Sequence, residues 1–247
     1  MDGDADIASL AAVIGDGARA KALLALGDGR ALAASVLAAE AGVSASTISG
    51  HLKRLVGAEL LVAESHGRHR YYRLAGPHVG RLLETLAEHS GPSPVRSLRE
   101  GTRAHAVREG RYCYDHLGGR LGVAIMSGLL DQAILAGGDG HFHPAKAAND
   151  RLSAPGNDVD YHLTDHGREW TRHFDIDLDA LTAHRRPPIR YCTDWSEQHH
   201  HLAGALGAAI AQQLINRHWI TRAPTGRAVH LTEPGREGLA IALNLTL

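Results

Sequence analysis

The second half of this 247-residue chain contains two nearly identical segments. Residues 116–125 read HLGGRLGVAI and residues 201–210 read HLAGALGAAI. A Cys-x-Asp triplet precedes each block, and each is followed by a nearly identical ending, YHLTDHGRE at 161–169 and VHLTEPGRE at 229–237. Repetition of this kind predicts two copies of one structural unit, each a long helix, a small hairpin and a closing helix. We expect the two apolar helices to pack on each other with approximate two-fold symmetry.

The first 90 residues have no such repeat and are dominated by helical periodicity. Apolar residues recur at helical spacing over 7–26, where two glycines predict either one broken helix or two helices. Residues 31–41 are alanine-rich and end at Gly42, a residue suited to a left-handed helix terminus. A further amphipathic helix is predicted over 78–89, and the Gly-Pro-Ser-Pro run at 91–94 ends it.

Between these helices lies a short helix followed by a basic hairpin. Ser44 is placed to cap a helix over 45–55, in which one stripe is apolar and the remaining side chains are small, polar or cationic. Two short extended runs, 60–65 and 69–74, flank a glycine turn and predict a hairpin with a basic tip. The apolar stripe consists of Ile48, Leu52 and Leu55.

The passage AAEAGVSASTISGHLKRLVGAELLVAESHGRHRYYRL resembles the DNA-binding core of the ArsR/SmtB family of bacterial repressors, which are winged helix-turn-helix dimers. The resemblance covers roughly residues 7–90. It implies a double-stranded DNA operator as partner and a homodimer whose contact is formed by the first helix and the helix over 78–89. The side chains expected to contact DNA are Ser44, Ser46, Thr47, Ser49, His51, Lys53 and Arg54 of the short helix, and Arg68 and Arg70 of the wing.

The expected fold class is therefore mainly α with small β-hairpins (α+β). Residues 1–92 are predicted to form a winged helix-turn-helix domain for DNA binding and dimerisation. Residues 93–247 are predicted to form a regulatory or sensor domain, with its repeated helix-hairpin-helix units at about 112–175 and 190–247. The working hypothesis is a transcriptional repressor that responds to an effector.

Charge and composition agree with an intracellular regulator. The net charge is -1, but a short stretch between Lys53 and Arg73 is basic, while the first 40 residues carry more acids than bases. No apolar run approaches the ~20 residues that span a bilayer, and the acidic start MDGDADIASL is unlike a secretory signal. We expect a cytoplasmic protein without membrane contact, whose two cysteines are reduced.

The repeated Cys-x-Asp triplets are the first candidates for a sensor site. Each is expected at a helix start, where the helix dipole lowers a cysteine pKa and favours metal ligation or reaction with oxidants and electrophiles. The alternative is that the aspartates are helix caps and the cysteines are small buried apolar residues. Because His201 matches His116 in the repeat, a transition-metal site is a testable form of the first hypothesis. The candidate effector residues are Cys113, Asp115, His116, Cys192, Asp194 and His201.

Two other effector sites are weaker candidates. The metal-sensing pattern Asp-x-His with two further ligands, typical of some family members, is half present, since His78 and His89 match but Gly76 and Pro92 occupy the other positions. Two histidines make a poor zinc site. An organic effector could instead lie between the repeated helices, although the residues concerned fit a plain hydrophobic core equally well. They are Leu121, Ile125, Met126, Leu206 and Ile210.

An enzyme is not expected. The chain has no glycine-rich phosphate loop, G-x-S-x-G elbow or HExxH motif. Two alternatives for the C-terminal half stay open, a protein-interaction domain and a thiol-dependent enzymatic domain. In the second, Cys113 would be the nucleophile, and His116 or a histidine elsewhere would be the base. The cofactor is left open, with a transition metal as one candidate, and none is required for DNA binding.

Overall fold

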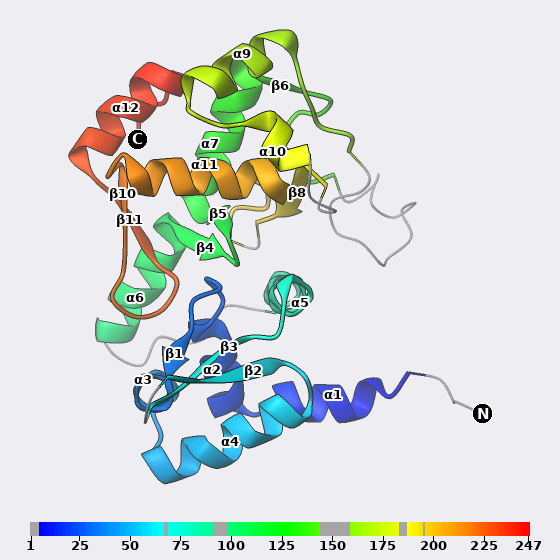
Figure 1. Ribbon diagram of the computed structural model, residues 1–247, viewed down its shortest axis with the longest axis vertical. Coiled ribbons are helices and arrows are strands. Elements are labelled where there is room, and N and C mark those ends of the chain that lie inside the picture. Colours follow the sequence, from blue (N-terminus) through cyan, green and yellow to red (C-terminus); the bar gives the residue numbers. More distant parts are fainter. Residues whose placement is uncertain (1–4, 67–68, 91–97, 144–158, 183–186, 195) are drawn as a thin grey trace. The chain divides into compact units, whose positions relative to one another are not determined.

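The computed structural model divides into two compact units (Figure 1). Contacts assign residues 1–84 with 224–227 to the first unit and residues 85–223 with 228–247 to the second. No helix among the described residues is both long and apolar enough to cross a bilayer. The described residues are 5–66, 69–90, 98–143, 159–182, 187–194 and 196–247.

Four short helices form most of the first unit. Asp6 and Asp16 cap the first two, because each carboxylate accepts hydrogen bonds from amides of the following turn. Residues 7–25 therefore form two separate helices and not one broken helix. Gly42 ends the third helix in the left-handed conformation, as expected. The helices are α1 (Ile7–Ile14), α2 (Gly17–Ala25), α3 (Ala34–Ala41) and α4 (Ala45–Gly57).

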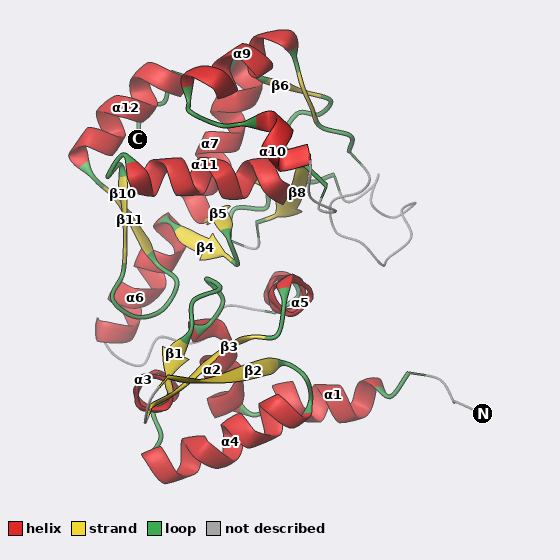
Figure 2. Ribbon diagram, viewed as in Figure 1, coloured by secondary structure: helices red, strands yellow, loops and turns green. Residues whose placement is uncertain are grey.

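A three-stranded antiparallel sheet completes the winged fold (Figure 2). The predicted hairpin is formed by β2 (Leu61–His66) and β3 (His69–Leu74). On the other edge of β3 lies β1 (Leu32–Ala33), in which Leu32 is opposite Tyr72. The helix predicted from residue 31 is wrong at its start, because this pairing takes two residues into the sheet and α3 begins only at Ala34.

Helix α5 (Pro77–Glu88) matches the helix predicted over 78–89. It buries Val79 and Leu83 and leaves Leu86 41% exposed. Helix α1 has no buried residue, and its Ile7 is 73% exposed. Both helices therefore present apolar side chains that the described residues leave uncovered.

Two segments of the second unit have the same order of elements, namely hairpin, helix, hairpin and helix. The first comprises β4 (Arg111–Cys113), β5 (His116–Gly118), α7 (Gly119–Asp131), β6 (Leu135–Ala136), β7 (His162–Leu163) and α9 (Asp165–His173). The second comprises β8 (Arg190–Thr193), β9 (His200–Ala203), α11 (Gly204–Asn216), β10 (Ile220–Arg222), β11 (Val229–Leu231) and α12 (Glu233–Leu243). Helix α6 (Leu98–Glu109) precedes the first segment, and α10 (Leu178–Thr182) lies between the two.

The opening hairpins differ from the sequence prediction. The repeated blocks at 116–125 and 201–210 predict long helices, but residues 116–118 and 201–203 belong to strands β5 and β9. Each pairs with the strand that carries the cysteine, so that Cys113 is opposite His116 and Cys192 is opposite His201. The small hairpin predicted after the long helix of the second copy is formed by β10 and β11.

The two segments are interleaved rather than joined only through their helices. Helix α7 packs against β9, and α11 packs against β5, so each long helix contacts the opening hairpin of the other segment. A glycine of each long helix faces the histidine of the other segment, since a Cβ on Gly122 would lie 3.5 Å from the Cβ of His201, and one on Gly207 would lie 3.3 Å from that of His116. One apolar core spans both segments and includes Leu121, Ile125, Met126, Leu206 and Ile210.

Gly122→Ala tests the close packing of α7 against β5 of its own segment. Its Cβ would lie 2.4 Å from the carbonyl oxygen of Leu117, where no ordinary contact fits. We expect the free energy of unfolding, measured by urea denaturation with circular dichroism, to fall by about 1 to 3 kcal/mol. The matched control is Gly50→Ala in α4, where a Cβ meets nothing within 4 Å; it should be neutral or stabilising by up to about 1 kcal/mol. Equal effects of the two substitutions would contradict this explanation.

Candidate functional site

Helix α4 presents a polar face opposite a buried apolar stripe. Ile48, Leu52 and Leu55 are completely buried, as predicted. Ser44 caps the helix by accepting a hydrogen bond from the amide of Thr47 at 3.2 Å. The predicted contact residues that are exposed on this helix are Ser44, Ser46, Thr47, Ser49, Lys53 and Arg54.

Several of these hydroxyl groups already have partners within the helix. The Ser44 hydroxyl lies 2.9 Å from that of Ser46 and 2.8 Å from that of Thr47, and the Ser49 hydroxyl donates to the Ala45 carbonyl at 3.0 Å. These bonds orient the hydroxyl groups and leave acceptor lone pairs free. The first turn of α4 is therefore an ordered polar surface.

His51 departs from the outward orientation expected for it. Its side chain is only 17% exposed, and its Nδ1 lies 3.6 Å from the Asp16 carboxylate and 3.4 Å from the Arg19 guanidinium. These contacts direct the ring toward the start of α2. His51 joins two helices and offers only a small part of its surface.

Of the two wing arginines predicted to contact DNA, the structure describes Arg70. Arg70 is exposed, and its guanidinium carbon lies 5.5 Å from the centre of the Tyr72 ring. Arg68 lies outside the described residues. Arg73 donates to Glu64 at 2.6 Å and is neutralised by it.

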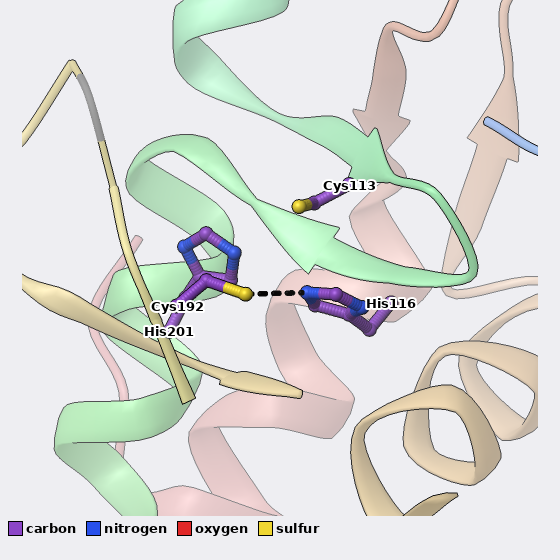
Figure 3. A group of neighbouring side chains, drawn as sticks. All are labelled: Cys113, His116, Cys192 and His201. Carbon is purple, nitrogen blue, oxygen red and sulfur yellow. Dashed lines mark hydrogen bonds between the residues drawn. The ribbon is translucent and has the colours of Figure 1, made fainter. Parts of the chain in front are cut away.

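The second unit brings together two cysteines and two histidines (Figure 3). Cys113 and His116 come from the β4–β5 hairpin, whereas Cys192 and His201 come from the β8–β9 hairpin. Directly opposite residues of an antiparallel pair point to the same face, so each hairpin directs one thiol and one imidazole to the same side. One potential ligand atom from each residue lies within 4.8 Å of all the others.

Each imidazole of this cluster has a carboxylate on one of its nitrogens. His116 Nδ1 lies 3.2 Å from Asp115 Oδ1, and His201 Nδ1 lies 3.1 Å from Asp194 Oδ2. The opposite nitrogen of His116, Nε2, lies 3.6 Å from Cys192 Sγ. The ring of His201 is buried and also interacts with the side chain of Cys113.

Asp194 is the most heavily bonded group near the cluster. Its Oδ2 accepts from Arg111 Nη2 at 2.8 Å and from the Gly119 amide at 2.7 Å, while its Oδ1 accepts from the Ser196 hydroxyl at 2.7 Å. The side chains of Asp194 and Arg111 are both 0% exposed. A carboxylate of the second segment thus holds strand β4 and the start of α7 in the first.

In the cluster, burial and the contacts with neighbouring groups shift the pKa values in opposite directions. Burial opposes protonation of His201, but Asp194 and Cys113 outweigh it and raise the His201 pKa to about 9. Burial likewise opposes protonation of His116, yet Cys113 and Asp115 raise its pKa. Although burial opposes ionisation of Asp194, contacts with His201 and Arg111 lower the pKa of this carboxyl far below its ordinary value.

Residues 16–62 match the family model described as bacterial regulatory protein, arsR family. Over 242 residues, the chain is 33% identical to the HTH-type transcriptional regulator YdfF of Bacillus subtilis (strain 168), and the match covers 98% of this chain and 99% of that protein. This chain belongs to the arsR family of bacterial regulatory proteins. It is a transcriptional regulator with an ArsR-family DNA-binding domain, and its similarity to YdfF extends over both units.

Other relatives share a smaller part of this ArsR-family chain. CmtR of Mycobacterium tuberculosis (strain H37Rv) is 38% identical over 82 residues, which is 33% of this chain and 69% of CmtR. The solution structure of the cadmium metal-sensor CmtR covers 37% of this chain and 99% of that chain, with 33% identity and a TM-score of 0.28. The homodimeric winged helix-turn-helix domain Mb0332 of Mycobacterium bovis covers 38% and 100%, with 27% identity and a TM-score of 0.31.

The structure corrects the prediction that the Cys-x-Asp triplets of this regulator lie at helix starts. Cys113 and Cys192 lie on strands, so no helix dipole acts on their thiols directly. The aspartates were predicted to cap the helices that follow them in sequence. Asp194 instead accepts a hydrogen bond from the first amide of α7, which belongs to the other segment. Asp115 instead contacts His116.

The other candidate effector sites are not assembled. His78 and His89 are exposed on or beside α5, and no cluster of potential metal ligands includes them among the described residues. The five residues considered for an organic pocket lie in the apolar core. Arg111 is the functional residue that the sequence reasoning missed. Its signal is the extension of the repeat to Arg-Tyr-Cys-x-Asp at 111–115 and 190–194.

Asp194→Asn tests the importance of the buried carboxylate. The neutral amide would leave the Arg111 guanidinium buried without a counter-charge, which typically lowers the free energy of unfolding by about 3 to 5 kcal/mol. Urea denaturation in the presence of a chelator measures the change. The control is Asp175→Asn, whose carboxylate is 74% exposed in its pair with Arg217; a loss of less than about 1 kcal/mol is expected there. A wild-type stability for Asp194→Asn would refute the assignment.

Proposed function

We propose that this ArsR-family regulator is a cytoplasmic homodimeric repressor that binds an operator through α4 and the wing and releases it in response to an effector held by the C-terminal half. The observation that carries the proposal is the exposed polar and cationic face of α4, backed by a completely buried apolar stripe. A helix of this kind enters the major groove with its first turns toward the base edges.

The DNA-binding surface has two parts with different tasks. Ser44, Ser46, Thr47 and Ser49 offer compact hydrogen-bonding groups that approach bases and phosphates closely. Lys53 and Arg54, with Arg68 and Arg70 of the wing, contact phosphates and position the protein without reading much sequence. His51 contributes chiefly by holding α4 against α2 near Asp16.

A homodimer supports this DNA-binding mode. One module spans too few base pairs for specific recognition, and two-fold dimers place their helices in successive major grooves. The exposed apolar side chains of α1 and α5, among them Ile7 and Leu86, are suited to pack against a second copy. The solved Mb0332 domain is itself described as homodimeric.

The C-terminal half is proposed to contain two copies of one unit, at about 112–175 and 190–247. The matching element orders support this view, as does the same capping arrangement in both segments. Thr164 and Thr232 each accept from an amide of the following helix and donate to carbonyls of the turn before the hairpin. Because the copies are interleaved, a ligand bound between them would contact both.

Lys53→Ala with Arg54→Ala tests the DNA-binding surface. Loss of two phosphate contacts should weaken binding across sequences and reduce the slope of log K against log salt by up to ~1.8. Fluorescence anisotropy of the full chain, on DNA selected by it from a random library, measures both quantities over a range of KCl concentrations.

The matched control is Arg172→Ala with Arg236→Ala, which removes two cations from α9 and α12. This double variant has the same net charge as the first and should keep the wild-type slope. If the two double variants have equal slopes, α4 does not carry the DNA contact.

A further inference from the structure

We infer that Cys113, His116, Cys192 and His201 bind one transition-metal ion in a tetrahedral site with two sulfur and two nitrogen ligands. These are the four residues whose potential ligand atoms converge between the two opening hairpins. Each hairpin contributes one cysteine and the histidine directly opposite it. The site is therefore built from equivalent positions of the two segments.

The spacing of the donor atoms fits an ion of this class. With Zn–S distances near 2.3 Å and Zn–N distances near 2.0 Å, ligand atoms of a tetrahedral site lie about 3.3 to 3.8 Å apart. Cys192 Sγ and His116 Nε2 are already 3.6 Å apart. No two of the ligand atoms are more than 4.8 Å apart, so closure requires a contraction of at most about 1.5 Å between any pair.

The surroundings orient both imidazoles for ligation. Asp115 contacts Nδ1 of His116 and Asp194 contacts Nδ1 of His201, which leaves each Nε2 as the ligand atom. A carboxylate on the distal nitrogen is the usual support of a metal-bound histidine, since it fixes the ring and raises its basicity. The two Cys-x-Asp triplets thus supply both sulfur ligands and both supporting carboxylates.

The fourth ligand, His201, is completely buried. Its potential ligand atom lies within 4.8 Å of those of the other three residues. An ion bonded to it would be enclosed by the protein, and the ring would keep its contact with Asp194.

The donor set selects the class of metal. Thiolate and imidazole ligands favour Zn²⁺ and related borderline or soft ions over Mg²⁺ and Ca²⁺, which prefer oxygen. Two thiolates and two neutral imidazoles offset a divalent charge. Because four side chains complete a tetrahedron, no coordination position stays open for a substrate, and the site is not catalytic.

Metal binding at this place links the two segments. The hairpins β4–β5 and β8–β9 would be joined through the ion, and each ligating histidine also faces a glycine of the long helix from the other segment, Gly122 for His201 and Gly207 for His116. Closure of the cluster therefore acts on α7 and α11. Only the next step rests on the proposed function: the ion is the effector of the repressor.

Cobalt titration of the reduced full chain under anaerobic conditions tests the site. We expect one Co²⁺ per chain, with sulfur-to-cobalt charge-transfer bands and the intense d–d bands of tetrahedral coordination, all displaced by one equivalent of Zn²⁺. Cys192→Ser removes one of the two sulfur ligands. The charge-transfer bands should therefore lose intensity, and binding should weaken at least 100-fold. His166→Ala, which removes an exposed histidine of α9, should bind as wild type.

A milder variant keeps the site testable where a ligand variant fails to fold. Asp115→Asn keeps all four ligands and changes a side chain that is 30% exposed, so the fold should persist. Loss of its support for His116 should weaken binding about 10- to 100-fold. The inference is overturned if reduced wild type shows no thiolate bands, if Cys192→Ser binds with wild-type affinity, or if anaerobically prepared protein holds a Cys113–Cys192 disulfide and no metal.

DNA anisotropy with Zn²⁺-loaded and chelator-treated protein separates the site from its role. The effector role predicts a 5- to 150-fold difference in operator affinity. Metal binding with unchanged operator affinity would overturn the effector role and leave the site intact. Metal binding by a chain that selects no DNA would overturn the proposed function alone.

Discussion

A buried carboxylate holds the second unit of this protein together. Asp194 comes from the second segment, yet it accepts hydrogen bonds from Arg111 on β4 and from the first amide of α7, both in the first. With both charged groups fully buried, neither can be satisfied by water, so the two segments must meet at this point. His201 lies against the same carboxylate, and the Cys and His side chains of both hairpins converge beside it as a consequence.

The interleaved packing extends this constraint to the rest of the unit. Each long helix lies on the other segment's hairpin, and a glycine at each contact faces the histidine of that hairpin. The ligand cluster is therefore attached to both α7 and α11 and to the apolar core between them. The cluster therefore contacts elements of both segments.

The DNA-binding unit was predictable because its signals are local. The Ser44 cap, the Gly42 terminus and the apolar spacing of α4 each act within a few residues, and all agree. Strand β1 was missed because it depends on pairing with Tyr71 and Tyr72, distant in sequence. The opening hairpins were missed because their strands are short, and Tyr114, at φ 64°, is not a residue that signals a turn. The sequence repeat identified the cluster residues, but only the fold shows that the two opening hairpins bring them together.

X-ray absorption spectroscopy at the zinc K-edge tests the central claim most directly, because it reports the identity of the ligand atoms. The measurement uses the full chain, reduced and loaded with one equivalent of Zn²⁺. Two sulfur atoms near ~2.3 Å and two nitrogen atoms near ~2.0 Å are predicted. A spectrum with only nitrogen and oxygen neighbours would show that Cys113 and Cys192 do not bind the ion, and the account of the two facing hairpins as a metal centre would be wrong.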